Sequence, residues 1–87
     1  MTRISKRMPT KSKQQRDPRR EVLRKLGENV RAYRHERGLT QEALAESLEL
    51  SVAYVSLIER GGRNPPYTTV VAIAKALGVS TGDICSE

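Results

Sequence analysis

Leu39-Thr40-Gln41-Glu42-Ala43-Leu44-Ala45, followed after a short interval by Tyr54-Val55-Ser56-Leu57-Ile58-Glu59-Arg60-Gly61, is the part of the sequence that decides the fold. Both segments place apolar residues at helical spacing, and each follows a hydroxyl residue, Thr40 or Ser51, that suits a helix N-cap. Only about three residues separate the two helical patterns, so the helices must cross steeply and the second is presented outward. Their capped N-termini direct free N–H groups and a partial positive charge toward any phosphate in front of them. The pattern therefore predicts a pair of helices suited to binding a nucleic acid.

The composition agrees with this expectation. The chain of 87 residues is long enough for one domain with a modest core, and its net charge of +6 favours a polyanionic partner. One cysteine, Cys85, excludes an internal disulfide, and with the one histidine, His35, it excludes the usual multi-ligand metal site. The longest apolar run, residues 70–74, is far too short to span a membrane, and the N-terminus lacks the apolar segment of a secretory signal. We expect a cytoplasmic protein that needs no cofactor.

The positive charge is concentrated at the N-terminus. Residues 1–20 hold eight basic side chains and one acid, a net charge of +7, whereas residues 21–87 hold eight basic and nine acidic groups. The few apolar residues of the first segment cannot offset the entropy of ordering it, so we expect residues 1–17 to form a flexible basic arm and residues 18–87 the folded domain. Such an arm adds affinity by lying along phosphates or entering a minor groove. The alternative is a solvated tail that aids solubility.

Caps and periodicity predict five helices and no strand, which makes a compact all-α domain. The Asp17-Pro18 pair is a helix start signal, and glycines end several of the helical patterns. The expected helices are residues 18–37, a helix after Thr40, residues 52–60, a nearly all-apolar helix through residues 70–77, and a short last turn. That turn is opened by a Ser80–Asp83 capping box and is expected to bury Ile84, with Cys85 a candidate to join it.

The combined pattern resembles the Cro/CI-type (XRE) helix-turn-helix family, which includes phage repressors and restriction–modification controller proteins. The resemblance covers about residues 22–86 and implies a five-helix, lambda-repressor-like DNA-binding domain with helix 52–60 in the major groove. Glu49 is a departure, because the family often has glycine between the two helices. If Glu49 adopts the left-handed backbone conformation that suits glycine, the cost is about 1 kcal/mol. The residues that carry the resemblance are Leu26-Gly27, Arg34, residues 38–42, Leu44-Ala45, Ser51, Val55-Ser56, Ile58-Glu59, Gly61, Pro65 and residues 73–80.

The outward face of helix 52–60 is expected to read the bases. At about 100° per residue, Val55 and Ile58 point toward the core, while the opposite side and the leading tip face the groove. This face is short of the arginine, asparagine and glutamine that make bidentate base contacts, so it favours thymine methyls and a T-containing half-site, with DNA shape adding specificity. Ordinary packing is the alternative for Val52 and Leu57. The predicted base-reading residues are Val52, Ala53, Ser56 and Leu57.

Phosphate contacts are expected on either side of this face. Gln41 matches the family glutamine that meets the DNA backbone, and Arg60, Arg63 and Asn64 match the loop with which the family grips it. Tyr54 is a further candidate through its hydroxyl, with a half-buried structural tyrosine as the alternative. Each phosphate that a basic group neutralises releases counterions, so affinity should fall steeply with salt.

Two polar residues are expected to be structural. Glu59 falls among the inward positions of its helix, and the family pattern pairs it with Arg34. If the pair is buried, removing one partner costs about 3–5 kcal/mol. The sequence has no glycine-rich phosphate loop, evident carboxylate pair or nucleophile beside a base, so we do not expect an enzyme.

A helix-turn-helix reads only about 4–6 base pairs, so a homodimer on a palindromic operator is expected, regulated by concentration, dimerisation or an outside partner. Dimer candidates are Val79, Ile84 and Cys85, with core packing as the alternative. The leading interpretation is a DNA-binding transcriptional regulator. The antitoxin of a toxin–antitoxin pair is an alternative, and so is a protein-interaction module, which the apolar reading face leaves open.

Overall fold

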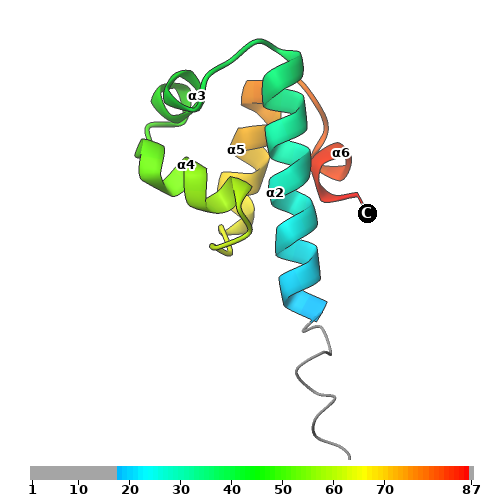
Figure 1. The fold of residues 1–87 in the computed structure, drawn as a ribbon. Helices are drawn as coiled ribbons and strands as arrows, with labels where there is room; N and C mark the ends of the chain where they lie inside the picture. Colours follow the sequence, from blue (N-terminus) through cyan, green and yellow to red (C-terminus); the bar gives the residue numbers. More distant parts are fainter. Residues whose placement is uncertain (1–17, 87) are drawn as a thin grey trace, which may run out of the picture.

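A computed structural model describes residues 18–86. Within this range the chain forms five helices and no strand, as predicted (Figure 1). The predicted arm of residues 1–17 lies outside the described residues. The helices are α2 (Pro18–Glu36), α3 (Gln41–Leu48), α4 (Val52–Glu59), α5 (Tyr67–Leu77) and α6 (Thr81–Cys85).

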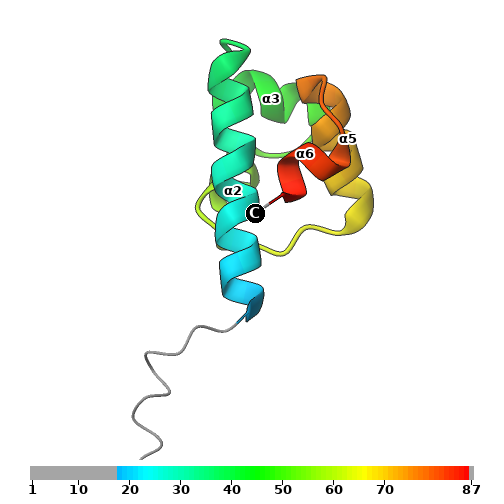
Figure 2. The ribbon, with the colours of Figure 1, turned by 90° about the vertical axis from the view of Figure 1, so that its right-hand side faces the viewer.

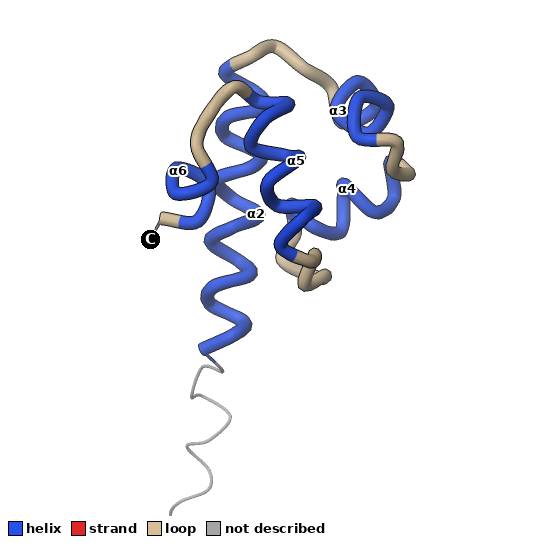
Figure 3. The backbone as a smooth tube through the Cα atoms, turned by 180° about the vertical axis from the view of Figure 1, so that it is seen from behind, coloured by secondary structure: helices blue, strands red, loops and turns tan. Residues whose placement is uncertain are grey.

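The long helix α2 is the support on which the other helices assemble. Helices α3 and α4 lie on one side of α2 and α6 lies on the other (Figures 1 and 3). In these views α5 lies between α2 and the pair of α3 and α4. The view turned by a quarter shows α6 packed between α2 and α5 (Figure 2). None of the described helices is long and apolar enough to cross a membrane.

Every helix contributes apolar side chains to one core. The predicted inward positions of α4, Val55 and Ile58, are buried there, and Ile84 brings the short α6 into the same cluster. The full set is Leu26, Val30, Leu44, Ala45, Val55, Ile58, Val70, Ile73, Ala74, Leu77 and Ile84. A core drawn from all five helices fixes the orientation of α3 and α4, which carry six of the nine residues predicted to contact DNA.

Helix α2 approaches α4 closely at Gly27. A Cβ atom at this position would lie 2.4 Å from the backbone oxygen of Ile58 and 2.5 Å from that of Glu59. Both distances are far below an ordinary van der Waals contact. Glycine is therefore required at this crossing for its lack of a side chain, although it lies inside a helix where it costs stability relative to alanine.

The C-terminal turn is tied back to α2 by one side chain. Asn29 Nδ2 donates to the backbone oxygen of Ile84 at 2.9 Å and to that of Ser86 at 2.8 Å. The predicted capping box is present, because Ser80 Oγ accepts from the Asp83 N–H and the Asp83 carboxylate accepts from the Ser80 N–H, both at 3.0 Å. A helix of five residues cannot hold itself together in water, so these bonds and the burial of Ile84 fix its position.

Candidate nucleic-acid interface

The turn between α3 and α4 has the geometry that the sequence predicts. Thr40 Oγ1 accepts from the Ala43 N–H and Ser51 Oγ accepts from the Tyr54 N–H, both at 3.0 Å, so each helix has its predicted N-cap. Between the helices, Glu49 has φ 59° and ψ 39°, the left-handed conformation considered for it. The turn forms despite this residue, because the Leu50 N–H returns to the Ala45 oxygen at 2.9 Å and closes the helix end.

Helix α4 has a buried side and an outward side. Val55 and Ile58 are almost fully buried, whereas Val52 at the leading tip is 38% exposed and Ala53 is exposed. Ser56 and Leu57 are half-buried one turn later, and the Leu57 oxygen accepts from the Gly62 N–H at 2.8 Å. The base-reading hypothesis requires an exposed apolar tip on a capped helix. Base contacts by Val52, Ala53, Ser56 and Leu57 stay a prediction.

The residues predicted to grip phosphates lie at both ends of the motif. Gln41 is the first residue of α3 and is half-buried, and Tyr54 is half-buried on α4. Arg60, Arg63 and Asn64 are exposed directly after α4. Among the described residues, neither Arg60 nor Arg63 has an ion-pair partner, so both guanidinium groups are available to an anion. Their contact with phosphate stays a prediction.

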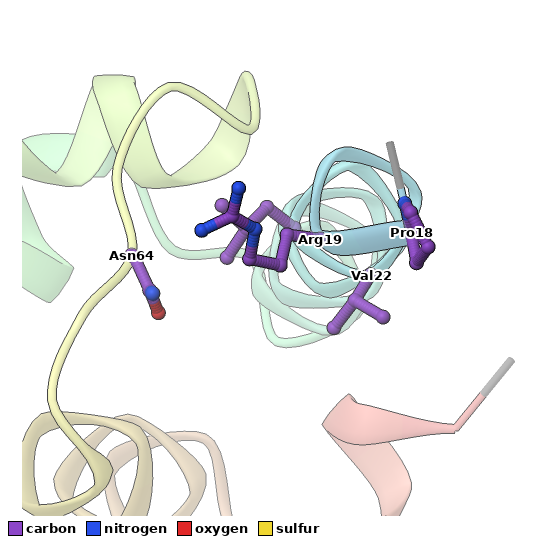
Figure 4. A pocket seen from close by; sticks show the side chains of 5 residues that line it. Pro18, Arg19, Val22 and Asn64 are labelled. Carbon is purple, nitrogen blue, oxygen red and sulfur yellow. The ribbon is translucent and has the colours of Figure 1, made fainter. Parts of the chain in front are cut away.

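The loop after α4 runs beside the first turns of α2. A Cβ on Gly61 would come within 3.0 Å of the Arg24 Cα, and a small hollow separates the next residues of the loop from the helix start. Figure 4 shows Asn64 and Arg19 on facing sides of this hollow. Pro18, the first described residue, also lines the hollow but lies on the side of α2 away from Asn64. The lining residues are Pro18, Arg19, Val22, Leu23 and Asn64.

Arg34 and Glu59 form the buried ion pair that the sequence analysis expects. Arg34 Nε donates to Glu59 Oε2 at 2.6 Å and Arg34 Nη2 donates to Glu59 Oε1 at 3.0 Å, and each residue is 7% exposed. Arg34 Nη1 also donates to the Leu39 oxygen at 2.8 Å. Glu59 has a third partner that was not predicted, because Gln41 Nε2 donates to the same carboxylate. No local pattern could have revealed that bond, because it depends on how α3 and α4 cross.

The dimer candidates separate in the structure. Ile84 has no exposed surface in the described chain, so for this residue core packing, the alternative interpretation, is the correct one. Val79 is half-buried and packs against the core, and Cys85 is exposed although burial in the last turn was considered for it. Cys85 points outward because in so short a helix only one of two adjacent residues can face the core.

Residues 30–84 match the model of the helix-turn-helix family HTH_3, and they span more than half of the chain. The chain belongs to this family. The match contains α3, α4, α5 and the buried pair, so the HTH_3 fold accounts for the geometry described above. It ends at Ile84, within α6.

Relatives within this family are regulators by name. The HTH-type transcriptional regulator y4dJ of Sinorhizobium fredii, itself uncharacterised, is 48% identical over 67% of this chain and 77% of its own. The immunity repressor of Bacillus phage phi105 is 44% identical over 71% of this chain, which spans only 43% of the repressor's length. The crystal structure of the restriction–modification controller protein C.AhdI from Aeromonas hydrophila matches with a TM-score of 0.69 and 35% identity, covering 71% of this chain and 94% of that one. The chain is thus a helix-turn-helix domain of the kind that transcriptional regulators carry.

Proposed function

We propose that this protein is a sequence-specific transcriptional regulator that binds double-stranded DNA as a homodimer on a palindromic operator, with α4 in the major groove. The observation that carries the proposal is the surface around α4. Helix α4 has an exposed apolar tip at its N-terminal end, and Gln41, which bonds Glu59, lies at the other end beside an arginine-bearing loop whose guanidinium groups have no ion-pair partner among the described residues. A reading helix flanked by phosphate-binding groups is how a helix-turn-helix docks on a duplex. A cytoplasmic location follows from that partner.

The chemistry of the reading face favours thymine. Val52, Ala53 and Leu57 offer methyl groups, which make apolar contact with the thymine 5-methyl group, and Ser56 offers one hydroxyl that can donate or accept. Because no side chain on this face makes a bidentate base contact, direct readout is modest. Sequence-dependent shape and the spacing of half-sites supply the remaining specificity.

Affinity is supplied by the basic groups next to this face. Arg60 and Arg63 neutralise phosphates, while Asn64 and Tyr54 donate hydrogen bonds to them. The basic arm adds to these contacts, since the folded part of the chain is nearly neutral. Pro18, the first described residue, lines the same small hollow as Asn64, which supports this role.

A dimer is proposed because one reading helix specifies too few base pairs. The surface near the end of the chain is the proposed contact, with Val79 and Cys85 as its apolar candidates after Ile84 is assigned to the core. A twofold axis there would place two copies of α4 on half-sites about one helical turn apart. Names such as repressor and controller protein among the relatives support a regulator of this kind.

Selection from a random pool of duplex DNA tests the proposal, first with the full chain and then without residues 1–17. We expect a palindrome with T-containing half-sites, bound by a species whose sedimentation mass is twice that of the chain. The truncated protein should recover the same sequence with lower affinity and a shallower salt dependence. Recovery of no sequence, or complete loss of binding with the arm, would contradict DNA reading by α4 and favour a protein partner for its apolar face.

A further inference from the structure

The first residue of α3 is held by the last residue of α4. Gln41 Nε2 donates to Glu59 Oε1 at 3.0 Å, and the two residues are 18 positions apart in the sequence. Gln41 is half-buried, whereas the Glu59 side chain is only 3% exposed. A hydrogen bond to a charged group that is shielded from water is stronger than the same bond at the surface.

The carboxylate that holds Gln41 is itself fixed. Arg34, from α2, bonds both oxygens of Glu59, and the planar guanidinium leaves the carboxylate one orientation. Arg34 is anchored in turn on the Leu39 oxygen, two residues before Gln41. Since Glu59 cannot rotate to follow Gln41, the orientation of the Gln41 amide is set by Glu59.

A carboxylate only accepts hydrogen bonds, so the nitrogen of the amide, and not its oxygen, must face Glu59. The two N–H bonds of an amide nitrogen diverge by about 120°, and the second N–H therefore points away from the carboxylate that holds the first. Phosphate oxygens also only accept. An unrestrained glutamine amide rotates between orientations that present its oxygen and orientations that present its N–H, and only the latter can bind a phosphate.

We propose that Glu59, held by Arg34, is a positioning residue that orients the Gln41 amide so that its second N–H donates to a DNA phosphate. This inference rests on the proposed function. Under this proposal Glu59 strengthens DNA binding, whereas its negative charge alone would weaken it. The direction in which DNA affinity changes when Glu59 is replaced therefore distinguishes a positioning role from a simple effect of charge.

Replacing the ion pair by apolar side chains, Arg34→Met with Glu59→Met, tests the proposal. The net charge is unchanged, and a buried pair exchanged for apolar side chains of similar volume commonly keeps the fold. Gln41→Ala in the wild-type chain should lower DNA affinity about tenfold, the loss of one hydrogen bond to a charged group, and the apolar pair should lower it by a part of that factor because the amide loses its fixed orientation. In the apolar-pair background Gln41→Ala should have a smaller effect than in the wild-type chain.

The single variant Glu59→Met gives a second test, provided that thermal unfolding shows this variant to be folded. It removes one negative charge, which by itself tightens DNA binding, yet positioning requires weaker binding. Glu42→Gln is the matched control, because it neutralises an exposed acid next to Gln41 in the first turn of α3 and should leave binding unchanged or tighter. Tighter binding by folded Glu59→Met, or additive losses from Gln41→Ala and the apolar pair, would overturn the proposal.

A measurement on the free wild-type protein does not depend on any variant. In an NMR spectrum the two side-chain amide protons of Gln41 should differ strongly in hydrogen-exchange rate, with the proton facing Glu59 protected. Equal, fast exchange of both protons would overturn the positioning role even if DNA binding is confirmed. If the wild-type protein has no sequence preference while the proton is protected, the proposed function fails, and the bond between Gln41 and Glu59 is structural only.

Discussion

Replacing Gly27 with alanine should destabilise the domain by about 2 kcal/mol. The new Cβ would lie 2.4 Å and 2.5 Å from two backbone oxygens of α4, about 1 Å closer than an ordinary contact. Overpacking of this kind costs about 3 kcal/mol where no flexible side chain can yield, and the obstacles here are backbone atoms. The better helix propensity of alanine returns about 1 kcal/mol. The cost of overpacking minus this gain leaves a net loss of stability of about 2 kcal/mol.

Urea unfolding followed by far-ultraviolet circular dichroism measures this effect. With an m-value of about 1 kcal/mol/M for so small a domain, the midpoint should fall by about 2 M. Gly82→Ala is the matched control, because a Cβ there meets only Ser80 Oγ, at an ordinary 3.7 Å. That variant should be neutral or more stable. A Gly27→Ala protein as stable as Gly82→Ala would refute the reasoning, since it would mean that α4 can move away from α2 at no cost.

Three further outcomes follow from substitutions of single residues. Glu49→Gly should stabilise the domain by about 0.5–1 kcal/mol in urea unfolding, because the residue has φ 59° and glycine relieves that strain at a smaller entropic cost; a loss of stability would contradict this. Asn29→Ala should speed amide exchange in the last turn and cost about 1–2 kcal/mol, because two backbone oxygens lose their donor; unchanged exchange would show that burial alone holds α6. Arg63→Ala should reduce the salt dependence of DNA binding, log K against log salt, by about 0.9, whereas Gln41→Ala, which removes no charge, should leave the slope unchanged. Lys25→Ala, on the same side of α2 as Asn29, is the charge control, and an equal change in slope would argue against a specific contact by the loop.

The helices could be predicted from the sequence because their signals are local. Thr40 and Ser51 begin α3 and α4, and the capping box begins α6, each through a bond that spans only three residues. Predicted boundaries fall within one residue of the observed ones for α2 and α4. The turn at Glu49 was also predictable, because its neighbours keep the pattern that closes α3.

Contacts between helices could not be predicted from the sequence, except where the resemblance to the family indicated them. The family pattern led to the Arg34–Glu59 pair, but the bond from Gln41 depends on the angle at which α3 crosses α4. Gly27 carries no local sign of its role, since a glycine inside a helix also occurs where nothing approaches it. For Ile84 the periodicity of a five-residue helix is too short to separate a core position from a dimer surface.

Gly27 and Arg34 act together on the end of α4. They are seven residues apart on α2, which places them two turns apart on one face of the helix. The Glu59 backbone passes Gly27, and its carboxylate bonds Arg34 and Gln41. Because Gly27 has no side chain, the end of α4 comes close enough to α2 for the carboxylate to reach both partners. The stability of the domain and the proposed phosphate contact of Gln41 therefore both depend on the position of Glu59. A substitution at Gly27 that moves α4 away from α2 should weaken DNA binding without altering any residue of the DNA-contacting surface.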